Sequence, residues 1–433
     1  MTPEIKNRIN QIHQSRVPEG YKETKAGFAP VDWTEVRLGD IYIERKEAGN
    51  AALPLLMVSI HFGVSDGEID EEDLPKTVKR IEDKSQYKRA AMGDLVFNMM
   101  RAWQGAVGTV CTEGMVSPAY IVAKPIGPVN PQFMNYYMKT SRMVYTMRRQ
   151  SYGVTDFRLR LYWDSFTQIQ CALPPIKEQQ KIAEILTTQD KVIELKEKLI
   201  EEKRQQKKYL MQQLLTGKKR LPLSDEEWGK VGFDEIFTFG STNTFSREFM
   251  EKDFCGPKNI HYGDVLVKYP EILDVSNNDI PALTLEAGNT VKECASNGDI
   301  IIADTAEDLM AGKVVEIQNI GKARIAAGLH TMLCKPASGY FVPGWLGYFM
   351  NSEYYHNQLI PYIAGVKVMS ISKGNILKTH LLVPSMQEQK MIVTVLSTAD
   401  QEISLLQQSL EQEKQKKKAL MQLLLTGIVG VSA

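Results

Sequence analysis

The chain contains a segment of 44 residues that occurs twice, and this internal repeat limits the possible folds more than any other feature. Residues 174–217 and 384–427 align without a gap at an offset of 210 residues and share 20 identical residues. Both copies are rich in Glu, Lys, Gln and Leu, start at Pro and end at Gly, and neither residue occurs between Pro175 and Gly217 or between Pro384 and Gly427. Each copy therefore predicts one long helix, and at ~1.5 Å per residue such a helix is a rod of roughly 60 Å.

Apolar residues recur at every seventh position in both copies. The series is Leu186, Ile193, Ile200, Lys207 and Leu214 in the first copy and Leu396, Ile403, Leu410, Lys417 and Leu424 in the second. A spacing of seven gives a narrow apolar seam, which suits two helices that pack along their length. We expect an antiparallel coiled coil whose continuity is in doubt where Lys interrupts each seam. The alternative is two unrelated surface helices, each lying on its own domain.

Each predicted helix follows a segment that mixes short β-branched runs, Gly and Pro with one helical stretch. This pattern predicts two α+β domains, and residues 297–302 (NGDIII) repeat the pattern of 92–97 (MGDLVF). The expected boundaries are a loosely held N-terminal arm at 1–30, a first domain at 31–173, a central helical spacer at 174–217, a linker at 218–231, a second domain at 232–383, a C-terminal helical spacer at 384–427 and a tail at 428–433. The acidic run at 67–76 is expected to be a solvated loop.

This connectivity predicts an α+β fold of two domains related by a pseudo-two-fold axis and joined by two long antiparallel coiled-coil helices. If the helices are antiparallel, the domains lie at opposite ends of the rod. Such a molecule suits two separated half-sites on duplex DNA, where spacing follows helical turns of roughly 34 Å.

The charge distribution and the cysteine content restrict the classes of protein that are compatible with this sequence. The net charge is zero, but residues 221–383 contain 13 Lys and Arg against 20 Asp and Glu, a net −7 that argues against simple phosphate binding by the second domain. The five cysteines form no CxxC pair, so neither a zinc site nor a disulfide framework is predicted. No run approaches 18 apolar residues. We expect a cytoplasmic protein with no membrane segment.

Catalytic motifs are missing from the sequence. It contains neither an Asn/Asp-Pro-Pro-Tyr methylation motif nor a GxxxxGK[ST] phosphate loop, and its six histidines are too dispersed for metal spacing. His330 could be a hidden catalytic base, but a packed or hydrogen-bonded histidine is the simpler interpretation. We therefore predict a non-catalytic protein without cofactor or metal.

Several motifs resemble those of the specificity subunit of a Type I restriction-modification system, along essentially the full length. They are the spacer openings LPPIKEQQKIAEIL and LVPSMQEQKMIVTVL, NMMRAWQGAVGTV and GMVSPAYIVAKP within 98–125, NGDIIIADTAED at 297–308 and AAGLHTMLCKP at 326–336. The resemblance implies two target recognition domains that each read part of a bipartite DNA sequence. It also implies spacers that bind two methyltransferase subunits, through which restriction subunits join. The alternatives are the specificity partner of a fused methyltransferase-nuclease and a coiled-coil protein scaffold without DNA readout.

The densest cluster of candidate DNA contacts in the first domain lies within residues 139–166. The candidates there are Arg148, Arg149, Tyr152, Arg158 and Arg160, joined by Arg101 and Gln104 from a loop. Arg can bind phosphates or guanine, and Tyr can bond phosphates or contact thymine methyl groups. The alternative is a solvated helix face followed by a strand. Trp103, beside the loop candidates, is better explained as a core residue.

The corresponding loop of the second domain contains fewer cations. Its candidates are Lys367, Ser370, Ser372, Lys373 and Lys378. We therefore expect readout of base edges with fewer phosphate contacts there. Residues 218–220 (KKR), after the first spacer, either reach phosphate or form an exposed helix cap.

Overall fold

The structure is a computed structural model that describes residues 2–50, 52–60, 63–66, 86–155, 158–222, 226–251 and 256–431. It contains two compact units, Met1–Glu197 with Ser409–Ala433, and Lys198–Gln408. Each unit thus holds one α+β domain, the first part of the helix that follows it, and the last part of the other helix. The acidic run at 67–76 lies outside the described residues.

Unit 1 is built on an antiparallel sheet of four strands in the order β4 (Tyr42–Glu44), β11 (Tyr120–Pro125), β8 (Leu95–Asn98) and β9 (Val107–Thr109). Four two-stranded pairs surround it: β1 (Tyr21–Thr24) with β2 (Gly27–Pro30), β3 (Thr34–Arg37) with β12 (Gln170–Leu173), β5 (Leu56–Ser59) with β6 (Gly63–Asp66), and β7 (Lys88–Ala90) with β10 (Gly114–Val116). Its shorter helices are α1 (Pro3–His13), α2 (Leu38–Ile41), η2 (Ala102–Gln104), α3 (Pro131–Tyr137), α4 (Ser141–Gln150) and α5 (Trp163–Thr167).

Local sequence signals explain where two of these helices begin. The Asn130 side chain caps α3, with Pro131 in its first turn, and the Thr140 hydroxyl caps α4. The N-terminal arm, expected to be loosely held, contains α1 and the β1–β2 hairpin. Its Arg8 and Tyr21 donate hydrogen bonds to the carbonyls of Ile428 and Gly427, just beyond α13.

Unit 2 has a larger sheet in the order β14 (Phe237–Phe239), β23 (Thr331–Pro336), β19 (Ile300–Ala303), β21 (Val314–Gln318) and β17 (Ile272–Asp274). A second sheet contains β15 (Met250–Glu251), β18 (Ala282–Leu283), β16 (Lys258–Ile260) and β22 (Ile325–Ala327), and two pairs join β13 (Gly229–Gly232) to β25 (His380–Val383) and β20 (Thr305–Ala306) to β24 (Met369–Ser370). The shorter helices are α7 (Phe233–Ile236), η3 (Arg247–Phe249), α8 (Tyr262–Val267), α9 (Leu285–Asn289), α10 (Trp345–Met350), α11 (Glu353–Leu359), η4 (Ile360–Tyr362) and α12 (Lys373–Ile376).

The repeated Gly-Asp motif plays the same role in both domains. Gly93 and Gly298 take positive φ angles of 89° and 86°, a region that favours glycine. The following Asp94 and Asp299 are buried, and each accepts a hydrogen bond from the backbone N–H three residues earlier. The two β-strands that follow, β8 and β19, therefore start from equivalent turns, as the sequence comparison predicts.

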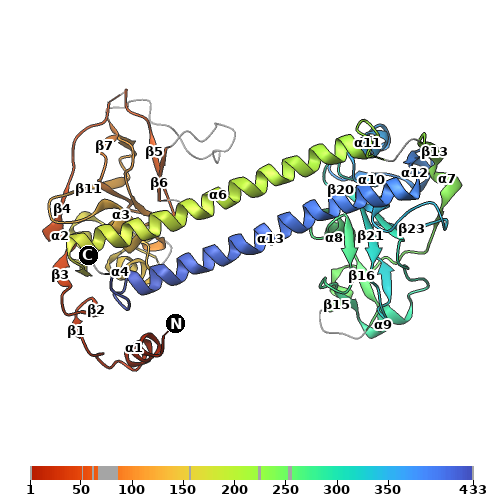
Figure 1. The fold of residues 1–433 in the computed structure, drawn as a ribbon. Coiled ribbons are helices and arrows are strands. Elements are labelled where there is room, and N and C mark those ends of the chain that lie inside the picture. The colour runs from red at the N-terminus through yellow and green to blue at the C-terminus, as the bar shows by residue number, and fades with distance from the viewer. Residues whose placement is uncertain are drawn as a thin grey trace. The chain divides into compact units, whose positions relative to one another are not determined.

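The two long helices are α6 (Ile176–Leu214) and α13 (Met386–Leu424), each of 39 residues (Figure 1). In unit 1, Asp190 of α6 pairs with Lys417 of α13, and the later residue Lys196 bonds the earlier residue Ser409. In unit 2, Lys203 pairs with Glu402. Residues later in α6 pair with residues earlier in α13, so the two helices are antiparallel in each unit. The predicted fold class is confirmed, and the alternative of helices that do not meet is wrong.

The lysine that interrupts each heptad series makes a specific polar contact. Lys207 lies 2.6 Å from Asp400 and 3.0 Å from Glu271, and Tyr348 donates a 2.7 Å hydrogen bond to the same Asp400. In unit 1 the equivalent residues repeat this triad: Lys417 pairs with Asp190, to which Tyr136 donates a 2.6 Å hydrogen bond. At the position where Lys interrupts each heptad series, a tyrosine of the domain therefore contacts the Lys-Asp pair that links the two helices.

The apolar cores also combine one domain with parts of both helices. In unit 1, Phe97, Phe133 and Phe166 pack in one cluster with Ile182 and Leu186 of α6, and with Leu424 and Leu425 at the end of α13. In unit 2, the corresponding cluster contains Trp345 and Phe349 with Ile392 and Leu396 of α13, and with Leu214 and Leu215. Four of the ten heptad positions, those nearest the helix ends, thus belong to the domain cores: Leu186, Leu214, Leu396 and Leu424.

Candidate nucleic-acid interface

Unit 1 presents a loop between α4 and α5 that is closed at its base. Tyr152 and Arg160 exchange two backbone hydrogen bonds of 3.1 and 3.0 Å, and the buried Leu161 donates its N–H to Met99. A Cβ added to Gly153 would lie 2.2 Å from the Arg158 carbonyl oxygen, so this position requires glycine. The loop is therefore anchored at both ends, while the side chains of Val154, Thr155 and Arg158 are exposed.

The predicted cations of the first domain are gathered around this loop. Arg158 and Arg160 are exposed on the loop itself, and Arg148 and Arg149 are exposed in the last turn of α4. Within the described ranges, none of these four arginines has an ion-pair partner. Unpaired guanidinium groups on one surface are suited to phosphate oxygens or guanine edges.

The short helix η2 lies against α4 and adds the loop candidates to the same region. Arg101 and Gln104 are exposed, whereas Trp103 is half-buried and donates its indole N–H to the Met100 carbonyl at 2.9 Å. The Arg148 guanidinium lies 5.8 Å from the centre of the Trp103 ring. Trp103 is thus only half-buried, contrary to the core interpretation, and it supports Arg148 through a cation–π contact.

Tyr152 is 59% exposed and stacks on Tyr162, with ring centres 4.8 Å apart. Beside it, a cleft of about 480 Å³ is lined by Lys25, Ala26, Arg142, Tyr145, Thr146, Arg149, Gln150, Gln168 and Gln170. Sequence reasoning missed Lys25, Gln168 and Gln170, because only tertiary packing brings the β1–β2 hairpin beside α4.

The equivalent loop of unit 2 has the same frame and is two residues shorter. Ala364 and Ser370 exchange backbone hydrogen bonds, and the buried Ile371 donates its N–H to Asp304. A Cβ on Gly365 would lie 1.9 Å from the Val368 carbonyl oxygen, which repeats the glycine requirement. By this register Ser370 occupies the position of Arg160, so the same frame carries a hydroxyl instead of a cation.

The other predicted residues of unit 2 lie in different settings. Lys367 is exposed on the loop, whereas the Ser372 hydroxyl caps α12 by accepting the Asn375 N–H at 3.3 Å. Lys378 donates to the Asn375 side chain at 2.9 Å and lies 4.9 Å from the Tyr362 ring centre. Ser372 and Lys378 thus make local structural contacts, and Lys373 lies 5.1 Å from the centre of the Phe239 ring, whereas Lys367 and Ser370 are exposed.

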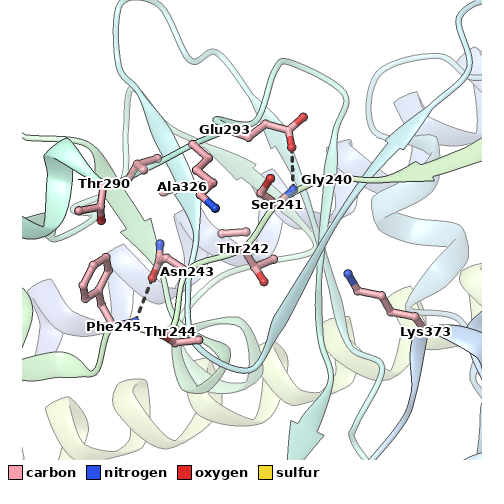
Figure 2. A pocket seen from close by; sticks show the side chains of 13 residues that line it. Gly240, Ser241, Thr242, Asn243, Thr244, Phe245, Thr290, Glu293, Ala326 and Lys373 are labelled. Atoms are coloured by element: carbon pink, nitrogen blue, oxygen red, sulfur yellow. Dashed lines mark hydrogen bonds between the residues drawn. The ribbon is translucent and has the colours of Figure 1, made fainter.

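A polar pocket of about 400 Å³ lies beside Lys373 (Figure 2). Its lining residues are Gly240, Ser241, Thr242, Asn243, Thr244, Phe245, Thr290, Val291, Lys292, Glu293, Ala326, Ala327 and Lys373. Figure 2 shows Lys373 across the pocket from Asn243 and Phe245. Sequence reasoning missed the 241–245 segment, since a Ser-Thr-Asn-Thr run after a strand has the composition of any polar loop.

One acidic group of this pocket is already neutralised. Glu293 lies 2.6 Å from Lys335 and accepts the Ser241 N–H at 2.6 Å. The hydrogen bond from Lys335 and that from Ser241 hold the pKa of the Glu293 carboxyl below its usual value. The pocket therefore offers mainly hydroxyl and amide groups, which suit base edges better than phosphates.

His330, considered as a catalytic base, lies 3.5 Å from Asp304 and 3.4 Å from the Thr305 hydroxyl. That hydroxyl donates instead to Asp304 at 2.7 Å. In the described part of the chain, no three His, Cys, Asp or Glu side chains are grouped so that they could hold a metal ion. No described helix is long and apolar enough to cross a membrane.

Comparisons with known proteins agree with the architecture. The family model of the Type I restriction modification DNA specificity domain matches residues 30–203. The MjaVIII specificity subunit of a Type I restriction enzyme from Methanocaldococcus jannaschii is 24% identical, over 97% of this chain and 98% of its own length. The putative MjaX specificity subunit of the same organism is 23% identical, over 95% and 97%.

Solved structures show the same fold at low sequence identity. A chain from a study of complex assembly and conformational transition of the type I R-M system matches with a TM-score of 0.57 and 16% identity, covering 93% of this chain and 99% of that one. The S subunit of a Type I system from M. genitalium matches with a TM-score of 0.50 and 12% identity, covering 90% and 96%. This chain is thus similar over nearly its whole length to specificity subunits of Type I restriction-modification systems, and its residues 30–203 match the DNA specificity domain of that family.

Proposed function

We propose that this chain is a non-catalytic subunit that reads a bipartite sequence in duplex DNA, one part by each domain, and directs methyltransferase and restriction subunits to it. The observation that carries the proposal is the anchored loop present in both domains. The frame is the same, yet Arg160 in one domain corresponds to Ser370 in the other. Equivalent frames with different side chains are what two unlike half-sites require.

The two domains divide the contacts differently in this proposal. In the first domain, Arg148, Arg149, Arg158 and Arg160 contact phosphates or guanine, and Tyr152 contacts the backbone or a thymine methyl group. In the second domain, Lys367, Ser370 and the pocket beside Lys373 read base edges. The net −7 charge of residues 221–383 fits this division, because a phosphate-binding surface would be basic.

The repeated helices are the proposed binding sites for two methyltransferase subunits, through which the restriction subunits join. Because the segments 174–217 and 384–427, which contain α6 and α13, share 20 of 44 residues, a protein that recognises one helix finds equivalent side chains on the other. Catalysis comes from these partners, and the subunit acts in the cytoplasm on double-stranded DNA.

Methylome sequencing with and without the gene tests this proposal. Loss of the gene should remove one split, asymmetric adenine-methylation motif, and the intact gene should restore it. A copy with Arg158→Ala and Arg160→Ala should restore methylation weakly, whereas an unchanged methylome after gene loss would overturn the proposal. A protein scaffold without DNA readout, in contrast, predicts no sequence-selective shift of duplex DNA even with partners present.

A further inference from the structure

Unit 1 contains a basic cleft of about 550 Å³ at the junction of α4 and the last turns of α13. Its lining residues are Thr140, Ser141, Arg142, Lys414, Lys417, Lys418, Met421, Gln422 and Thr426. Four of the nine are cations, of which Lys414 and Lys417 pair with Glu197 and Asp190, and none of the four is a proposed DNA contact of the first domain. The cleft therefore calls for a separate explanation.

Unit 2 shows what the equivalent residues bind. The caps Thr140 and Ser352 start the equivalent helices α4 and α11, so Ser141 corresponds to Glu353. The Glu353 carboxylate accepts hydrogen bonds from Lys208 at 2.8 Å and from the Gln212 amide at 2.7 Å. At the repeat offset of 210, Lys208 and Gln212 correspond to Lys418 and Gln422 of the cleft.

Unit 1 keeps the donors of this arrangement and lacks its acceptor. Ser141 replaces the glutamate, and among the described residues neither Lys418 nor the Gln422 amide has a carboxylate partner. Gln422 is exposed, whereas Gln212 is half-buried. The same structure that holds a carboxylate in one unit is thus open in the other.

The surrounding charges favour an anion still more strongly in unit 1. By the same alignment, Lys139 and Arg142 stand where unit 2 has Asn351 and Tyr354. Burial, and next the nearby Lys417, lower the pKa of Lys139. Asp190 acts on Lys139 in the opposite direction. Among the described residues, the cations of the cleft without a carboxylate partner are Arg142 and Lys418.

We infer that this cleft binds an acidic side chain of a partner protein, whose carboxylate takes the place that Glu353 fills in unit 2. The inference rests on the proposed function, in which α13 binds a methyltransferase subunit. A protein carboxylate is favoured over a DNA phosphate because the repeat itself holds a carboxylate on these donors. Met421 and the lysine stems also give the cleft an apolar wall suited to a side chain.

The test is to fill the cleft from within by Ser141→Glu, which copies unit 2. Calorimetric titration of the full chain with its cognate methyltransferase subunit should show binding weakened about tenfold at one of two sites, since like charges are placed together. Ser141→Gln has the same size without the charge and should weaken binding much less. Lys418→Glu removes a donor and should weaken it at least as much as Ser141→Glu.

Thermal unfolding separates these effects from misfolding. Ser141→Glu should melt at or above the wild-type temperature, because an acidic residue in the first turn of α4 stabilises the helix. Glu353→Ser should open the cleft of unit 2, and Lys208 then becomes as available as Lys418.

The outcomes distinguish this inference from the proposed function. Wild-type chain that does not bind the methyltransferase subunit overturns both. Wild-type binding with equal binding by Ser141→Glu overturns only the inference. If Ser141→Glu instead weakens duplex DNA binding by the isolated chain and leaves partner binding intact, the ligand is phosphate and the inference is wrong.

Discussion

The two units share their helix contacts and differ in the surfaces that face solvent. Gln179 and Gln389 each accept a backbone N–H from their domain, at 2.8 and 2.9 Å, and each donates to the carbonyl of the proline that precedes its helix. Both units also contain the same Lys-Asp-Tyr triad. The loops built on these supports, in contrast, carry Arg160 in one unit and Ser370 in the other.

This difference shows that one set of residues positions each domain on the helices and another set forms its exposed loop. Repeated residues fix the position of each domain on its helices, because changing a buried glutamine or ion pair leaves its partners unsatisfied. Within the described part of the chain, the side chains of Arg160 and Ser370 have no such partners, so these two residues can change without loss of the fold. In the proposed function, a constant support under a variable surface allows one half of the target to change independently.

Domain exchange tests that independence and should have the largest effect. Replacing residues 31–173 by the corresponding domain of a relative should change one half of the methylated sequence and leave the other half intact. A wrong base pair costs about 1–3 kcal/mol, so three changes reduce affinity for the original target by roughly a thousandfold. Methylome sequencing provides the measurement. Simultaneous change of both halves would contradict independent readout.

The two triads should differ in strength, and methionine substitutions measure the difference. The Lys207 side chain is 11% exposed and contacts two carboxylates, whereas Lys417 is 28% exposed and has one. Lys207→Met leaves the half-buried Glu271 and Asp400 without their cation and should lower the free energy of unfolding by about 2 kcal/mol, less than for a fully buried pair. Lys417→Met should cost about 1 kcal/mol because solvent screens it more.

Urea unfolding of each variant gives these values, and equal losses would show that the triads are equivalent. Burial by itself lowers the pKa of Lys207, but Glu271 and Asp400 more than offset this and raise it above its ordinary value. The folded pKa therefore exceeds the unfolded one. The stabilisation is complete at neutral pH and is lost only as the pH rises through the folded pKa of Lys207.

Exchange of Arg160 and Ser370 tests the proposed division between phosphate and base contacts. Arg160→Ser should weaken DNA binding about tenfold at low salt and reduce the slope of log affinity against log salt by about one. Ser370→Arg should increase that slope by a similar amount. Fluorescence anisotropy over a salt series measures both. An unchanged slope in both variants would place this loop position away from phosphate.

The smallest expected effect concerns a polar contact between α6 and α13. Its acidic residue occurs in only one of the two copies of the repeat. Glu413 stands where the first copy has Lys203, and it accepts hydrogen bonds from Gln189 at 2.8 Å and Lys196 at 3.1 Å. These bonds lower the pKa of Glu413 to about 2. The pair therefore stabilises unit 1 at neutral pH, and this contribution is lost as the pH falls towards about 2.

Carboxyl chemical shifts in an acid titration measure the Glu413 pKa directly. Gln189→Ala should move it towards the ordinary glutamate value, and Glu413→Gln should remove the corresponding acid sensitivity of unfolding. A Glu413 that titrates in the ordinary range would show that this helix contact does not form in solution.

The sequence alone determined the fold class, because the 44-residue repeat with its heptad spacing admits few architectures other than two domains on two paired helices. It also located the anchored loops of both domains and the arginines near the first one, since cations and glycines are visible in a linear pattern. The place of each domain boundary and the DNA contacts themselves remain predictions.

Only the tertiary structure explained why Lys207 and Lys417 interrupt the seam and brought Lys25 beside Arg149. It also showed that Ser372 caps a helix. In unit 2, Glu353 fills a site, and the equivalent site of unit 1, beside Ser141, is open. These facts depend on groups distant in sequence that meet in space. Local patterns record which side chains are present, whereas charge pairing, capping and clefts depend on which of them become neighbours on folding.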